Sequence, residues 1–286
     1  MTNKIVSALE DGAGKLIKTL GDDAGKAVKN LYHDTGNRLK RVSSNHLEND
    51  AKHAAELERI AKRPRTEETP IYHVGDDGTI RRLHHDPSAK DPEKRYTKSD
   101  LTDDDKKRLG LDSSSIGRPV AGERNARLKR KGEEGYTRPR PQAPSQEVAL
   151  GSTDLAQATQ LARHADKSYG SRLGDGEFQS NNYAAARVRS KDGSGDFVIV
   201  GRSNGYRHSE RMIGTPFLRE GEPSRIREVY TEREPCTDPP SCRSWIAERF
   251  PSSVQVSHSV EYGDKESRAR GNSTMENYLN QLKKQR

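Results

Sequence analysis

The sequence predicts an α/β domain over residues 151–286, in which helices cover a partly parallel β-sheet. Two observations support this prediction. All four Phe, the single Trp and six of the ten Tyr lie after residue 150, and aromatic side chains dominate the apolar surface that a core buries. In the same segment, helical and extended patterns alternate along the chain, which is typical of a sheet layered with helices.

The rest of the chain is more polar. Lys and Arg number 51 against 43 Asp and Glu, and only 29% of the 286 residues are hydrophobic, which is too few for one core through the whole chain. We therefore expect a helical region over residues 1–66 and a polar, largely irregular linker over residues 67–150. No stretch approaches the roughly 20 apolar residues of a membrane span, and the N-terminus lacks the apolar run of a secretory signal.

Residues 11–43 contain a repeat of eleven residues, which reads "DGAGKLIKTLG", "DDAGKAVKNLY" and "HDTGNRLKRVS". Because eleven residues make three helical turns, the repeat keeps one apolar stripe on one face of a helix. Two interpretations fit. The helix either docks on a membrane surface or a delivery partner, or forms a helical hairpin that packs on itself. A second helical pattern follows and ends at the Pro of "KRPRTEETP".

Within residues 67–150, "PIYHVGDDGTIRRLHHD" predicts a small hairpin around Asp76, Asp77 and Gly78. Further on, "RNARLKRKGEEGYTRPRPQAPSQ" is typical of a basic linker that contains proline. Its charge could hold nucleic acid loosely, but a solvated tether explains it more simply.

The predicted domain opens with a helix in "STDLAQATQLARHADKSYG", capped by Ser152 or Thr153 and closed by Gly170. Two strands, "NNYAAARVRS" and "GDFVIVGRS", then flank a turn at residues 192–195, which predicts a hairpin. A short helix should start near His208. The remaining elements alternate as strand, helix, strand and helix, in "SRIREVYTERE", "SCRSWIAERF", "VQVSHSVEYG" and "NSTMENYLNQLKK".

Two short motifs in this domain carry residues suited to metal chemistry. "GYRHSERMIG" contains His208 and Glu210, and "EPCTDPPSC" contains the only two cysteines of the chain, Cys236 and Cys242. One His and two thiolates form a tetrahedral zinc set that leaves a fourth position for water. Glu210 is close enough to His208 in sequence to serve that water without binding the metal. A local disulfide or a coincidence would also explain two cysteines, but neither accounts for the "HSE".

These motifs resemble those of the zinc-dependent nucleoside and nucleic-acid deaminases, whose signature is H-x-E followed by P-C-x-x-C. More narrowly, "RHSERMIG", "YTEREPC" and "SHSVEYGD" look like the Xanthomonas-type deaminase domains at the C-termini of bacterial polymorphic toxins. The resemblance covers roughly residues 150–286 and implies a cytidine deaminase-like, three-layer α/β/α fold. The sequence departs from the family in one respect, because five residues rather than two separate the cysteines. Cys236 is therefore expected in a loop and Cys242 in the first helical turn, with Ser241 as the cap.

The resemblance implies a zinc-dependent hydrolytic deaminase that converts cytosine to uracil in DNA, with single strands favoured, or in RNA, as an interbacterial toxin. His208, Cys236 and Cys242 would hold Zn²⁺, and Glu210 would be catalytic and transfer protons. The implied partners are a nucleic-acid substrate, a cognate immunity protein, and secretion machinery that recognises the N-terminal region and delivers the toxin to the target-cell cytoplasm. A deaminase of adenine, one of free nucleosides or nucleotides, and a non-catalytic zinc or disulfide nucleic-acid-binding adaptor stay open.

Three further residues are candidates for contact with the substrate. Asn204 is placed like the substrate-binding Asn of the family, although in "RSNGY" a turn with Gly205 explains it equally simply. Trp245 could stack on a base, and a core Trp on a helix is the alternative. His258 could face the substrate, or it could be an ordinary strand histidine.

Arg207 and Arg211 flank the histidine motif, and Arg202 lies on the strand before it, so all three could meet phosphates or simply be solvated. From residue 151 onward the chain has 21 Lys and Arg, of which 16 are Arg, against 18 Asp and Glu. Arginine suits bidentate phosphate contacts. An excess of three positive charges is too small to identify a nucleic-acid-binding protein by itself, so the polymeric substrate rests on the family resemblance.

Overall fold

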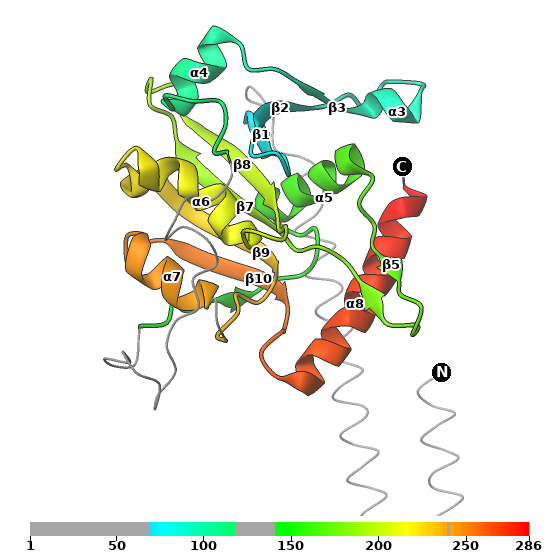
Figure 1. Cartoon of the computed structure of the whole chain (residues 1–286). Coiled ribbons are helices and arrows are strands. Elements are labelled where there is room, and N and C mark those ends of the chain that lie inside the picture. Colours follow the sequence, from blue (N-terminus) through cyan, green and yellow to red (C-terminus); the bar gives the residue numbers. More distant parts are fainter. Residues whose placement is uncertain (1–68, 118–140, 239–240, 286) are drawn as a thin grey trace, which may run out of the picture. The chain divides into compact units, whose positions relative to one another are not determined.

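The computed structural model describes residues 69–117, 141–238 and 241–285 of the chain. The repeats of residues 11–43, the rest of the region 1–66 predicted to be helical, and most of the basic segment before residue 141 lie outside these ranges. The described residues form a mixed α/β structure around a central eight-stranded sheet (Figure 1).

The sheet has the strand order β3-β2-β1-β8-β7-β9-β10-β4. β7 pairs antiparallel with both β8 and β9, whereas β1 pairs parallel with β8 and β10 pairs parallel with β9 and β4. The prediction of a partly parallel sheet is therefore confirmed. The strands are β1 (Ile71–Val74), β2 (Ile80–His85), β3 (Tyr96–Ser99), β4 (Gln146–Glu147), β7 (Tyr183–Arg189), β8 (Asp196–Arg202), β9 (Ile226–Arg233) and β10 (Gln255–Val260).

Helices cover both faces of the sheet (Figure 1). Alternate residues of β7 define the two faces. Ala184 and Ala186 pack in one cluster with α6 and α7, and Tyr183 and Ala185 pack in another with α5. The helices are α3 (Pro92–Arg95), α4 (Asp103–Leu109), α5 (Asp154–Asp166), α6 (Ser209–Arg219), α7 (Cys242–Arg249) and α8 (Lys265–Lys284), with a 3₁₀ turn, η1, at Pro223–Arg225.

The order of elements predicted after residue 151 is confirmed from α5 to α8. Thr153 caps α5, because its side chain accepts a hydrogen bond from the backbone N–H of Ala156. The helix ends at Lys167, which adopts a left-handed φ of 53°, three residues before the predicted Gly170. The predicted turn at residues 192–195 joins β7 to β8 as an antiparallel hairpin.

Residues 71–99 differ from the expected irregular linker, because they supply three strands of the main sheet. The hairpin predicted around Gly78 is confirmed as β1 and β2, and Gly78 takes a φ of 78°. β1 then pairs parallel with β8, with Ile71 opposite Val198, and this buries Tyr72 completely. Since this pairing joins segments more than a hundred positions apart, no local pattern in the sequence announces it.

α8 packs beside the sheet over a separate apolar cluster. Met275 and Leu279 of the helix meet Phe178 of the short hairpin formed by β5 (Ser171–Arg172) and β6 (Phe178–Gln179). This contact places the middle of α8 next to the segment that leads from α5 to β7. Within the described ranges, none of the helices combines the length and the apolar composition that a membrane span requires.

Candidate metal centre

The two sequence motifs meet at one edge of the sheet. β8 and β9 both run antiparallel to β7, so they share one direction and their carboxyl ends lie at the same edge. His208 is the N-cap residue of α6 after β8, Cys236 follows β9, and Cys242 is the first residue of α7. The predicted positions of both cysteines, one in a loop and one in the first turn, are confirmed.

The three side chains form a group with the dimensions of a zinc site. His208 Nδ1 lies 3.6 Å from Cys236 Sγ and 3.4 Å from Cys242 Sγ, and all three atoms lie within 4.8 Å of one another. Tetrahedral zinc, with bonds of about 2.3 Å to sulfur and about 2.0 Å to nitrogen, places the two ligand atoms about 3.6 Å apart. Both cysteines are free rather than joined in a disulfide. The donor set and its spacing therefore fit a zinc ion, with Nδ1 as the histidine ligand atom.

The loop between the cysteines brings the sulfurs together despite its length. Ser241 occupies the predicted cap position, but its side chain makes no capping hydrogen bond, because the residue adopts a left-handed φ of 49°. It is one of two non-glycine residues with positive φ in the described ranges, the other being Lys167. Such a conformation costs about 1–3 kcal/mol, which indicates that the surrounding contacts hold this turn in place.

The cysteine pair favours one thiolate. The thiol of Cys242 and the ring of His208 stabilise a negative charge on Cys236 against the cost of burial, and they lower the pKa of Cys236 to about 4. The backbone N–H of Cys242 also donates to Cys236 Sγ, at 3.3 Å. The contact with Cys236 and burial raise the pKa of Cys242 well above its ordinary value. A bound divalent cation favours deprotonation of the second thiol as well.

Glu210 is the second residue of α6 and is 2% exposed. Its Oε2 accepts a hydrogen bond from Ser209 Oγ at 3.1 Å. Burial, and then the nearby negative charge of Cys236, raise the pKa of Glu210 above its ordinary value, whereas the charge of His208 lowers it. Glu210 is thus within electrostatic reach of two ligands without belonging to the ligand group. A carboxyl group with a raised pKa beside a metal is suited to transferring protons.

Asn182 links the elements around the centre, and the sequence did not single it out. Its Nδ2 donates to Ser209 Oγ at 2.9 Å and to Thr231 Oγ1 at 2.7 Å. Its Oδ1 accepts from the backbone N–H of Arg233 at 3.0 Å. One side chain therefore holds the first turn of α6 against the end of β9. Asparagine is common before a strand, so the sequence carries no signal specific to this role.

Two of the predicted substrate residues have clear partners within the fold. Asn204 Oδ1 accepts hydrogen bonds from the backbone N–H groups of Tyr206 and Arg207, both at 2.9 Å, which is the turn that "RSNGY" allowed. Arg207 is 2% exposed, and its Nη1 donates to the carbonyl oxygen of Gly117 at 2.8 Å. Contact of either residue with a substrate stays a prediction.

Trp245 lies in the packing of α6 against α7. Its ring meets that of Phe250 edge to face, with centroids 5.2 Å apart, and the guanidinium of Arg211 lies 5.4 Å from its centroid. It also fills the space beside Gly214 of α6, where a Cβ atom would come within 2.7 Å of the indole ring. Trp245 is thus partly buried and packs against the core, as the alternative interpretation expected, and its contact with a substrate stays a prediction.

His258 lies on β10 and is 5% exposed, with Nδ1 hydrogen-bonded to Ser145 Oγ at 2.7 Å. Burial lowers the pKa of this histidine. Arg202 forms an ion pair with Asp76, and its Nε donates to Asp76 Oδ1 at 3.0 Å. The candidate metal ligands and Glu210 are thus brought together, whereas His258 and Arg202 have their own structural partners.

A family model described as Xanthomonas-like deaminase matches residues 179–280. The matched segment contains His208, Glu210 and both cysteines, together with the strands and helices that position them. No curated protein and no solved structure matches the chain. The family match supports a deaminase-family domain in this part of the chain, and the metal centre lies within it.

Proposed function

We propose that residues 151–286 form a zinc-dependent hydrolytic deaminase of a nucleobase, with a cytidine deaminase-like fold. The substrate that we favour is cytosine in nucleic acid, converted to uracil, with single-stranded DNA preferred over RNA. One observation carries the proposal. His208, Cys236 and Cys242 meet at distances that suit zinc, with the buried Glu210 beside them, inside the segment that matches the deaminase family.

The side chains of the site have two separate roles, metal binding and proton transfer. His208 Nδ1 and the two sulfurs would hold the ion, and a zinc ion bound there supplies the Lewis acidity that makes water nucleophilic near neutral pH. Glu210 accepts a proton from the attacking water and passes it to the ring nitrogen next to the reacting carbon. The second proton of the water goes to the departing amine, the C–N bond breaks, and ammonia leaves with a carbonyl oxygen in place of the amino group.

The surroundings of Glu210 favour this role. Because Glu210 is 2% exposed, its carboxyl group is shielded from bulk water, and burial raises its pKa above the ordinary value, which suits proton transfer near neutral pH. Asn182 fixes Ser209, and Ser209 Oγ in turn donates to Glu210 Oε2. The start of α6 also directs backbone N–H groups toward negative charge that develops at this edge of the sheet.

The biological role that we propose is that of an interbacterial toxin. The motif resemblance supports this role, as does the polar N-terminal region with its repeat of eleven residues. Its partners would be a cognate immunity protein and a secretion system that recognises the N-terminal region. Deletion of residues 1–66 should then abolish delivery into a neighbouring cell and leave deamination by the purified protein unchanged. Equal loss of both would assign the N-terminal region to the enzyme itself.

The activity is tested directly with the purified full chain. Single-stranded DNA, double-stranded DNA, single-stranded RNA and cytidine are offered in parallel, and uracil and hypoxanthine are measured by mass spectrometry, with Glu210→Gln as the control. The proposal expects uracil in a single strand. Turnover of cytidine alone would indicate a deaminase of free nucleosides, turnover only of an adenine-containing strand would reassign the base, and zinc without turnover on any substrate would indicate a binding adaptor.

A further inference from the structure

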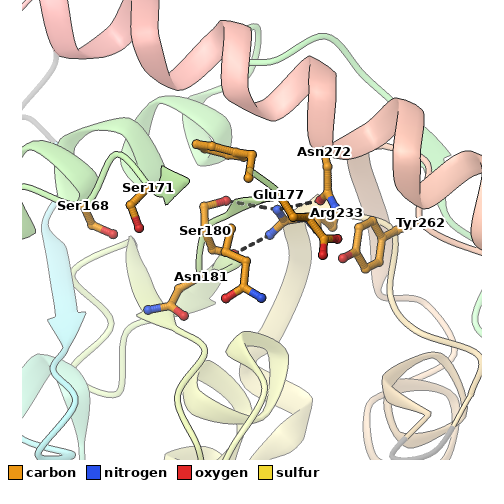
Figure 2. A pocket seen from close by; sticks show the side chains of 11 residues that line it. Ser168, Ser171, Glu177, Ser180, Asn181, Arg233, Tyr262 and Asn272 are labelled. Atoms are coloured by element: carbon orange, nitrogen blue, oxygen red, sulfur yellow. Dashed lines mark hydrogen bonds between the residues drawn. The ribbon is translucent and has the colours of Figure 1, made fainter. Parts of the chain in front are cut away.

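A second feature of the fold is a polar pocket of about 380 Å³. The loop from α5 to β7, the end of β9, Tyr262 before α8 and Asn272 within α8 form its walls (Figure 2). Arg233 in its wall stands three residues before Cys236 in the sequence. Asn182 joins the two sites, since it binds the backbone of Arg233 and the side chain of Ser209.

Arg233 is 6% exposed, and its hydrogen-bond partners are all neutral. Its Nη1 donates to the carbonyl oxygen of Ser180 at 2.9 Å, and its Nη2 donates to Ser180 Oγ at 3.0 Å and to Asn272 Oδ1 at 3.4 Å (Figure 2). The ring of Tyr262 lies beside the guanidinium, with the centroid 5.0 Å from the central carbon. Within the described residues, the Nε–H of Arg233 is buried without an acceptor, and no carboxylate forms an ion pair with this side chain.

A comparison with Arg163 shows how unusual this is. Arg163 is also buried, but it forms a bidentate ion pair with Glu232, at 2.5 and 2.6 Å. Burial of a guanidinium charge without a counter-ion is costly, and burial lowers the pKa of Arg233 accordingly. An anion that enters the pocket would supply the missing charge and an acceptor for the remaining N–H.

The two acids that flank Arg233 in the sequence are engaged elsewhere. Glu232 is taken by Arg163, and Glu234 Oε1 accepts from Arg243 Nη1 at 2.9 Å. Glu177 is the one acid that lines the pocket, and it is exposed on the loop between β5 and β6, without an ion pair to Arg233. The remaining polar lining is neutral and rich in hydroxyl and amide groups, from Ser168, Ser171, Ser180, Asn181, Tyr262 and Asn272 (Figure 2).

We propose that this pocket binds a phosphate group of the substrate, with Arg233 as the residue that meets its charge and the serine and asparagine side chains as further donors. A planar guanidinium among neutral donors suits phosphate oxygens. That the phosphate belongs to the deaminated nucleotide rests on the proposed function, whereas phosphate binding itself does not. The phosphate could be the terminal group of a mononucleotide or the diester next to the target base in a strand.

Binding is measured by calorimetric titration of the full chain with inorganic phosphate, cytidine, cytidine 5′-monophosphate and a short single strand with one cytosine. We expect Arg233→Gln to weaken binding of every phosphate-bearing probe about tenfold or more and to leave cytidine unchanged. Arg233→Lys should restore part of the affinity. Arg268→Gln is the matched control, because Arg268 also lies over Tyr262, at 5.6 Å, but is paired with Asp238 at 3.1 Å.

The same titrations distinguish the two possible sources of the phosphate, which are the terminal group of a mononucleotide and the diester of a strand. Equal loss for the mononucleotide and the strand indicates a terminal phosphate, whereas a loss confined to the strand indicates the diester. In turnover, Arg233→Gln should raise KM for the phosphate-bearing substrate and leave the kinetics of cytidine unchanged. A purely structural role for Arg233 would affect both substrates alike and would overturn the proposal.

Glu177→Gln provides a second test that does not depend on a buried residue. The change removes the one negative charge from the pocket lining at an exposed position, so phosphate affinity should rise about two- to threefold. Unchanged affinity in this variant, or no phosphate binding by the wild type, would refute the pocket while leaving deamination intact. Phosphate binding without any base conversion would instead refute the proposed function and preserve the pocket.

Discussion

His208 Nδ1 lies 3.4 Å from Cys242 Sγ, although 34 positions separate the two residues. The contact exists because β8 and β9 end at the same edge of the sheet, and each is followed by the helix at whose start one of the two residues lies. We expect His208→Ala and Cys242→Ser each to lower zinc content from about one ion per chain to near zero, since loss of one ligand leaves two. Elemental analysis of the purified protein measures this.

His84 supplies the control for that experiment. It is an exposed histidine on β2, bound to Ser99 Oγ at 2.7 Å and far from both motifs in the sequence. His84→Ala should retain its zinc. Full zinc content in the His208 or Cys242 variants would show that the ion binds elsewhere.

Glu210→Gln separates proton transfer from metal binding. Because Glu210 is coupled to the ligands without belonging to their group, the variant should keep its zinc. General acid–base catalysis contributes a factor of about 10²–10⁴ to the rate, so kcat should fall by at least about 10²-fold. Steady-state kinetics and metal analysis on one preparation test both statements. Loss of the zinc would assign Glu210 to the metal, and an unchanged kcat would remove it from the mechanism.

Asn182→Ala tests how the first turn of α6 is positioned. The change removes the hydrogen bonds to Ser209 and Thr231, and Ser209 in turn contacts Glu210. A small misplacement of a catalytic group can cost up to about 10²-fold in rate, so kcat should fall while KM and zinc content change little. Asn277→Ala, at an exposed position of α8, is the control. A change in KM alone would show that Asn182 acts on substrate binding.

The buried ion pair between Arg163 and Glu232 should contribute more to the free energy of unfolding than an exposed ion pair does. Both side chains are fully buried, and Arg163 also holds the carbonyl oxygens of Ser168 and Asn181, which line the polar pocket. Glu232→Gln leaves a buried cation without its counter-ion, and it should cost about 3–5 kcal/mol of the free energy of unfolding. Urea unfolding of the full chain, followed by circular dichroism, measures the loss.

The exposed pair Arg172–Glu276 is the matched comparison, because it is also bidentate, at 2.7 and 2.8 Å, while the Arg172 side chain is 63% exposed. Glu276→Gln should cost no more than about 1 kcal/mol. Similar losses in the two glutamate variants would refute the argument from burial.

His164 makes stability depend on pH. Its ring stacks on Tyr96, with centroids 4.4 Å apart, and its Nδ1 shares a hydrogen bond with the hydroxyl of Tyr169. Burial, and then the neighbouring charge of His85, lower the pKa of His164 to about 4, from 6.5 for an exposed histidine. Between these values only the unfolded chain binds the proton, so the free energy of unfolding falls as pH drops from 6.5 toward 4.

His164→Gln removes this titration, and urea unfolding at a series of pH values should show a shallower decline for the variant than for the wild type over that interval. Parallel curves for the two proteins would mean that His164 binds its proton equally well in the folded and the unfolded chain.

The sequence predicted the elements after residue 151 because their signals are local. Thr153 caps its helix, and the turn at residues 192–195 lies between two runs of apolar residues. The sequence also identified His208, Cys236 and Cys242 as candidate ligands, because the motif keeps their types and order, and the fold brings the three side chains together. The five-residue gap between the cysteines correctly predicted Cys236 in a loop and Cys242 in the first helical turn. It did not predict the left-handed φ of 49° at Ser241.

Roles that depend on distant contacts could not be predicted in this way. The parallel pairing of Ile71 with Val198 turns an expected linker into part of the sheet. In the sequence, Arg233 looks like any other arginine of a charged strand. Only the fold shows that its neighbour Glu232 pairs instead with Arg163, which lies 69 positions from Glu232. The role of Asn182 likewise becomes visible only in the fold, where its side chain donates hydrogen bonds to Ser209 and Thr231.

The central claim is that zinc held by His208, Cys236 and Cys242 enables removal of an amino group from a nucleobase. The most direct measurement is ammonia release from a cytosine-containing single strand as zinc is titrated into chelator-treated full chain. We predict almost no release without zinc, a rise that saturates at about one equivalent per chain, and no rise in the Glu210→Gln variant. Full release by the zinc-free protein, or none at any zinc level on any nucleobase, would contradict the account.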